Sequence, residues 1–199
     1  MRSSLRILPG AAALLGGLAW VVHALLLAVR PLGCVGGACF AGVLRHRESE
    51  DIAWLLLVAV LLLAAAAGVA ARSGRARRRW TASLLLLLAG AALLVVGLFV
   101  NRGASDGSPL WWLHDSDTLG RLLPVAGAFA AGLALWGEAS RRLALLFLGA
   151  AAVGLFVNVQ DHRVLLDLPI GLAWVVLGVR TALSPPQPGK ATPASVRQA

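Results

Sequence analysis

The sequence lacks the short motifs that mark many nucleotide-binding, hydrolytic and haem-binding proteins. It has no G-x-x-x-x-G-K-[ST] loop to hold phosphates and no G-x-S-x-G elbow to present a nucleophilic serine. His23 is the only histidine inside a long apolar segment, so the paired ligands of a membrane b-type cytochrome are missing. The apolar segments also lack the polar stripes of a pore. These absences argue against those classes of protein.

Acidic residues and cysteines are scarce, whereas apolar residues are abundant. Of the 199 residues 59% are hydrophobic, against about 45–50% in a typical soluble domain. The excess is Leu, Ala and Val in blocks that reach the roughly 20 residues needed to cross a hydrocarbon core of ~30 Å. A net charge of +9 on a soluble protein would suggest a nucleic-acid partner. Because the charges here lie between apolar blocks, we expect a membrane protein that binds no nucleic acid.

Six apolar segments predict an all-α, multi-pass bundle of about six transmembrane helices. The expected spans are residues 7–29, 52–71, 81–100, 119–137, 143–159 and 164–183, which together form one domain over residues 1–183. The first is longer than the apolar core of a signal peptide, about 7–15 residues, so we expect it to remain as a helix. The tail, residues 184–199, is rich in Pro, Ser and Ala and is expected to be disordered and cytoplasmic.

The arginines predict the orientation of the bundle. Seventeen of the 18 basic residues are arginine, and 12 basic residues fall on the side that holds both termini, against 6 on the other side. Cytoplasmic loops carry such an excess, so both termini are expected to be cytoplasmic. The Ala-, Gly- and Arg-rich composition is typical of a GC-rich bacterial genome. We therefore expect the protein in a bacterial cytoplasmic membrane.

The two cysteines, Cys34 and Cys39, lie in the stretch PLGCVGGACF, which this orientation places outside the cell. That compartment permits disulfides, and the glycines around the pair let a short loop close on itself. A structural disulfide is favoured over a thiol–disulfide exchange centre because the spacing is C-x4-C and there is no second pair to relay electrons. Free thiols, or a metal site to which His46 could contribute, are less favoured than the disulfide.

Two ionisable residues lie inside expected spans, where an ionisable group costs about 2.5–3.5 kcal/mol on insertion scales. His23 is six residues from the outer end of the first span, and Asp167 is about one turn into the sixth. Their similar depth makes them the candidate catalytic pair if the first and sixth helices pack together. A structural role would instead have His23 bond a backbone carbonyl and Asp167 cap the sixth helix.

The outer loops hold further imidazole and carboxylate groups, which suit Zn²⁺ or another divalent metal. The candidates for such a site are His114, Asp115, Asp117, Asp161 and His162. Their spacing matches no compact metal motif. A structural explanation is that Asp117 or Thr118 caps the fourth helix, while Trp111 and Trp112 belong to an interfacial aromatic belt.

Two hexapeptides occur twice. VGLFVN ends the third span and recurs at residues 153–158, and GLAWVV lies at residues 17–22 and 171–176. Internal repeats occur in transporter folds, but a limited alphabet of Leu, Ala, Val and Gly also repeats by chance.

Three functions remain open. The favoured one is a non-enzymatic accessory, scaffold or sensor subunit. The second is a membrane enzyme with an outward-facing His/Asp site, with or without a metal, that acts on a lipid-like substrate. The third is a small transporter. The lipid bilayer and other membrane proteins are the expected partners, and no motif identifies a cofactor.

Overall fold

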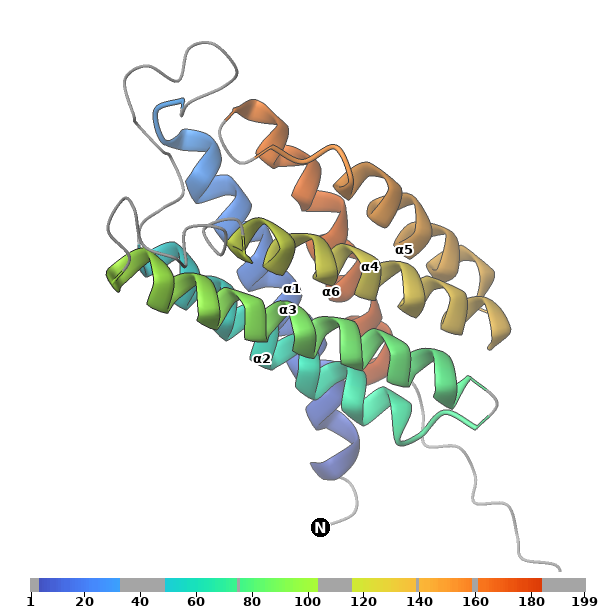
Figure 1. The fold of residues 1–199 in the computed structure, drawn as a ribbon. Coiled ribbons are helices and arrows are strands. Elements are labelled where there is room, and N and C mark those ends of the chain that lie inside the picture. Colours follow the sequence, from blue (N-terminus) through green and yellow to red (C-terminus); the bar gives the residue numbers. More distant parts are fainter. Residues whose placement is uncertain are drawn as a thin grey trace, which may run out of the picture.

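The structure is a computed structural model that describes residues 4–32, 49–74, 76–103, 116–138, 140–158 and 161–183. These residues form a bundle of helices with no strand, which confirms the all-α prediction (Figure 1). In chain order the elements are α1 (Ser4–Val29), α2 (Ser49–Ala70), α3 (Arg77–Gly103), α4 (Ser116–Gly137), α5 (Arg141–Gly154), the 3-10 helix η3 (His162–Asp167) and α6 (Leu168–Leu183).

Four segments of the described chain are long and apolar enough to cross a membrane: Ile7–Val29, Ala53–Ala70, Arg77–Gly97 and His162–Leu183. The apolar part of α4, Leu122–Gly137, is shorter. Helix α5 has 14 residues and is therefore about 21 Å long. The fold is thus a helical membrane bundle with four segments that can span a membrane, together with the shorter apolar part of α4 and the short helix α5.

The fifth and sixth segments differ from the sequence prediction where they meet, at the end of α5 and the start of α6. The fifth helix was expected to reach residue 159 but ends at Gly154, where the backbone packs closely against Ile170 of α6 and Val125 of α4. The chain then turns at Leu155 and leads to η3. The sixth segment begins with this 3-10 turn, and α6 follows with Pro169 in its first turn, where a missing N–H is tolerated.

Helices α1 and α6 pack antiparallel with their backbones in close approach. A Cβ atom added to Gly17 would lie 2.6 Å from the carbonyl oxygen of Gly171 and 2.7 Å from the backbone nitrogen of Val175. Seven residues away on each helix, Gly10 and Gly178 approach each other in the same way. Small residues drive this kind of association because lipid offers helices no hydrophobic incentive to pair.

The two copies of GLAWVV face each other across this interface. The glycine that begins each copy packs against the glycine and the first valine of the other: Gly17 against Gly171 and Val175, and Gly171 against Gly17 and Val21. An interface between two antiparallel helices that is symmetric in this way favours the same residues on both sides. The likeness of the two hexapeptides therefore has a packing explanation.

Helices α3 and α4 form a second interface of the same kind. Gly90 lies against Gly120, and a Cβ atom on Gly90 would be 3.0 Å from the carbonyl oxygen of Gly120. Seven residues along each helix, Ser83 takes the place of one glycine, and its Oγ donates a 2.8 Å hydrogen bond to the carbonyl oxygen of Gly127. Two pairs of helices, α1–α6 and α3–α4, thus bring their backbones into close contact at glycines.

One end of the bundle is rich in arginine. The N-terminus of α1, the α2–α3 connection, the α4–α5 turn and the C-terminus of α6 all lie there (Figure 1). Its exposed described arginines are Arg72, Arg77, Arg78, Arg79, Arg141, Arg142 and Arg180. Arg79 of α3 donates to the carbonyl oxygen of Leu133 in α4 at 2.8 Å, and Arg180 of α6 donates to the Oγ atom of Ser140. These side chains join neighbouring helices at this end.

Candidate functional site

The candidate pair lies at the end of the bundle opposite the arginine-rich end, where η3 packs against α1, α5 and α6. His23 is on α1 with 4% of its surface exposed, and Asp167 is the last residue of η3 with 8% exposed. Ser83 is the third polar residue of the described chain that is buried. The two ionisable groups therefore lie in the interior of an otherwise apolar bundle.

The register of the α1–α6 interface places the two residues at the same level. Gly17 is opposite Gly171 and Val175, so an antiparallel step of six residues brings His23 level with residues 165–169. Asp167 is in the middle of this range. Both residues have interaction partners in the structure. A direct bond between the imidazole and the carboxylate stays a prediction.

The surroundings of His23 hold its side of the bundle together. The indole Nε1 of Trp54 on α2 donates a 2.9 Å hydrogen bond to the carbonyl oxygen of Ala19 on α1. Trp20, the residue after Ala19 in α1, is buried in the core. This backbone contact fixes α2 against α1 one helical turn from His23. The imidazole is thus carried by a helix that its neighbours hold on two sides.

The chemistry of the pair follows from the two groups and their position. Asp167 immediately precedes α6, where the positive end of the helix dipole favours a carboxylate. An imidazole can donate from one ring nitrogen and accept at the other, and it changes charge near neutral pH in water. Together they can hold or exchange a proton. They can equally fix the junction of η3 and α6 against α1.

The predicted outer metal site is described only in part. Asp161 caps η3: its Oδ1 accepts from the backbone N–H of Arg163 at 2.7 Å, and its Oδ2 accepts from Nε of the same arginine at 2.8 Å. The Arg163 Nη2 atom lies 2.7 Å from the same oxygen. The hydrogen bond from the guanidinium lowers the pKa of Asp161 below its ordinary value of 3.8. The carboxylate is therefore already neutralised by a cation.

The other predicted ligands do not complete this site within the described chain. His162 is exposed at the start of η3, and Asp117 belongs to the first turn of α4. His114, Asp115 and the side chain of Asp117 lie outside the described residues, as do Cys34, Cys39 and the tail from residue 184. Among the residues that the structure describes, no three His, Cys, Asp or Glu side chains gather to hold a metal ion.

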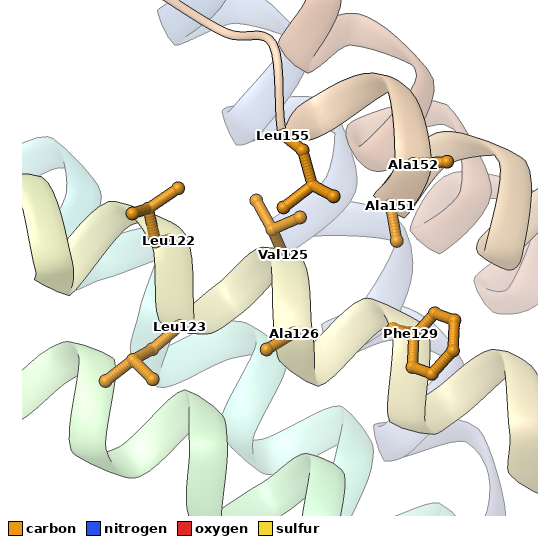
Figure 2. Close-up of a pocket in the computed structure, with 8 residues that line it drawn as sticks. All are labelled: Leu122, Leu123, Val125, Ala126, Phe129, Ala151, Ala152 and Leu155. Carbon is orange, nitrogen blue, oxygen red and sulfur yellow. The ribbon is translucent and has the colours of Figure 1, made fainter.

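The structure adds an apolar groove between α4 and α5 that the sequence did not predict. It has a volume of about 450 Å³ and is lined by Leu122, Leu123, Val125, Ala126, Phe129, Ala151, Ala152 and Leu155. Val125 and Ala151 are buried at its floor, whereas Leu122, Phe129 and Leu155 are exposed at its rim. Figure 2 shows Val125 and Leu155 pointing toward each other between the two helices. In the sequence, the only indication of this groove was that the fifth apolar segment, residues 143–159, is short for a transmembrane span.

No family model, curated protein or solved structure matches this chain. Function is therefore argued from its own residues.

Proposed function

We propose that the protein is a non-catalytic accessory or scaffold subunit of a bacterial cytoplasmic membrane. The observation that carries this proposal is the backbone-level packing of α1 on α6 and of α3 on α4. Helices joined through glycine in this way leave little room to slide or separate, which suits a rigid platform. Large apolar side chains such as Leu25, Leu57 and Leu145 remain exposed on the outside and suit contact with lipid or with a partner's helix.

The proposed orientation puts the arginine-rich end in the cytoplasm. Seven exposed arginines against one described acidic residue, Glu138, make this end strongly positive. Alkaline phosphatase fused at Gly74 or Ser184 should then be inactive, and a fusion near Asp106 should be active. An active fusion at Gly74 would reverse the orientation.

This orientation also supports a disulfide between Cys34 and Cys39 in the first outer loop. Mass spectrometry of unreduced protein should recover the linked loop peptide. Recovery of two alkylated thiols after blocking at lysis would count against the bond and would favour free thiols.

The scaffold proposal is tested by complementation of a deletion strain. His23→Ala with Asp167→Asn should still complement if the variant accumulates in the membrane, because a scaffold needs the bundle and not these side chains. Gly17→Leu should fail, since a leucine there collides with the backbone of α6. Failure of the first variant with normal accumulation would overturn the proposal.

That failure would favour the second candidate, a membrane enzyme with an outward-facing His/Asp site that acts on a lipid-like substrate. It is supported by two buried ionisable residues at one level of the bundle. A transporter has less support, because it rested on the repeats and the two GLAWVV copies have a packing explanation.

A further inference from the structure

We propose that the groove between α4 and α5 binds one acyl chain of a membrane lipid. This binding site is independent of the proposed scaffold function. It is argued from the shape of the two helices, from the chemistry of the lining and from the volume of the groove.

The groove lies where α5 stops, because Gly154 still packs against Val125 of α4 and the helix does not continue along α4 beyond it. Toward the arginine-rich end, a Cβ atom on Gly132 of α4 would be 2.9 Å from the side chain of Leu148, so the helices touch. Toward the opposite end, α5 stops at Gly154, and the chain leads to η3, which packs on α1, α5 and α6 (Figure 1). The outer half of α4 is thus left without a full-length neighbour on this side.

Helix α5 is too short to cover α4 across the whole thickness of the bilayer. At about 21 Å, α5 is roughly 9 Å shorter than a hydrocarbon core of ~30 Å. The groove begins where α5 ends, between Ala151, Ala152 and Leu155 on one side and the first half of α4 on the other. This is the depth at which lipid tails surround the other helices.

The lining accepts hydrocarbon and little else. All eight lining residues are Leu, Val, Ala or Phe. A headgroup would find no partner among these side chains, so the bound part of a lipid must be its chain. Three rim residues expose large parts of their side chains: 41% of Leu122, 49% of Phe129 and 66% of Leu155. The groove therefore opens on the face of the protein where the tails lie.

The volume of the groove fits an acyl chain better than a transmembrane helix of another protein. A dry cavity of about 150 Å³ holds a benzene ring of six carbons, so the 450 Å³ groove holds about 18 carbons, the size of one acyl chain. A transmembrane helix with its side chains is about 10–12 Å wide and could place only one or two side chains there. Hydrocarbon that fills the groove restores the dispersion contacts that its walls otherwise lose.

The test uses the purified full-length chain in nanodiscs of phosphatidylcholine and phosphatidylglycerol with a photoreactive diazirine near the end of one acyl chain. Peptides of α4 and α5 should be labelled more than the lipid-facing peptides of α1, α2 and α3. Ala152→Phe, which fills the rim of the groove, should reduce this labelling to the level of the other helices.

Ala92→Phe is the matched control, because Ala92 is also exposed but lies on α3, away from the groove. It should leave labelling of α4 and α5 unchanged. Equal melting temperatures of the two variants would show that both fold, and Ala126→Phe offers a second filling variant if Ala152→Phe does not. Even labelling of all helices, or cross-links between two copies through α4 and α5, would overturn the proposal.

Discussion

The α1–α6 and α4–α5 interfaces each pack two apolar helices together, but they do so in different ways. At the first, two glycines seven residues apart on each helix face one another, and the backbones touch at both pairs. At the second, Gly132 meets Leu148 and Gly154 meets Val125, but Leu122 and Phe129 of α4 lie beside the end of a short helix. The first interface is filled by protein, and the second leaves a groove.

The difference shows what decides helix packing in a membrane. Lipid tails are as apolar as leucine, so a leucine gains little by leaving lipid for another helix. What remains is close van der Waals contact, which needs small residues at matched positions on both helices. At the α4–α5 interface the glycines of the two helices do not face each other: Gly132 and Gly154 each meet a larger side chain, and Gly149 meets nothing within 4 Å.

The largest expected effect tests the glycines of the tight interface. Gly17→Ala should lower the free energy of unfolding by about 1–3 kcal/mol, because the new methyl group would lie within 3 Å of backbone atoms of Gly171 and Val175, which can move only if the helices shift. The measurement is thermal unfolding in detergent, followed by circular dichroism.

Gly149→Ala is the matched control on α5. A Cβ atom at Gly149 meets nothing within 4 Å, so this change should be neutral or stabilise the helix slightly. Equal destabilisation by both variants would mean that backbone contact is not what holds α1 to α6.

A smaller effect is expected at the α3–α4 interface, which resembles the first but carries one hydrogen bond. Ser83→Ala keeps the close approach and removes the bond from Oγ to the carbonyl oxygen of Gly127. Interhelical hydrogen bonds of this kind contribute about 0.6 kcal/mol on average and at most about 1.7 kcal/mol. The melting temperature should fall by less than for Gly17→Ala.

Thr81→Ala provides the control for Ser83. Its hydroxyl donates to the carbonyl oxygen of Arg77 within the same helix and is exposed, so its loss should change stability less. A Ser83→Ala variant as damaging as Gly17→Ala would show that the hydrogen bond, rather than the small side chain, dominates this interface.

Hydropathy was enough to predict the helices but not how each one ends. The hexapeptide VGLFVN demonstrates the limit, because it is helical throughout at residues 96–101 of α3 but leaves the helix after Gly154 in α5. The same six residues thus adopt two conformations. In the second copy the helix ends because Gly154 contacts Ile170 and Val125 and the chain then turns toward η3. Such contacts depend on the assembled bundle and leave no mark in the local sequence.

Part of the candidate site could be predicted from the sequence, and part could not. His23 and Asp167 stand out in a sequence because ionisable groups are rare in apolar segments, and both are buried in the structure. Ser83 was missed because a serine within a run of leucines gives no sign of its partner; the hydrogen bond to Gly127 exists only in the register of α3 on α4. The groove was missed because it depends on where α5 ends beside α4 in the assembled bundle.

The smallest expected effect concerns the loop that replaces the missing turns of α5. Asp161 accepts two hydrogen bonds from Arg163, and the bond from the arginine side chain is the main cause that lowers the pKa of the carboxyl below 3.8. A carboxyl whose pKa is lower in the folded state stabilises the fold at pH values above its unfolded pKa. That contribution is lost as the pH falls through the lower, folded pKa.

Arg163→Gln should therefore slightly lower the melting temperature at pH 7, and the difference from the wild type should shrink as the pH falls below 3.8. Both groups are accessible to water, so added salt should also weaken the effect. Arg142→Gln, which changes an exposed arginine at the other end of the bundle, controls for net charge. A difference between Arg163→Gln and the wild type that stays constant from pH 7 to pH 3 would mean that Arg163 stabilises the loop without its bond to Asp161.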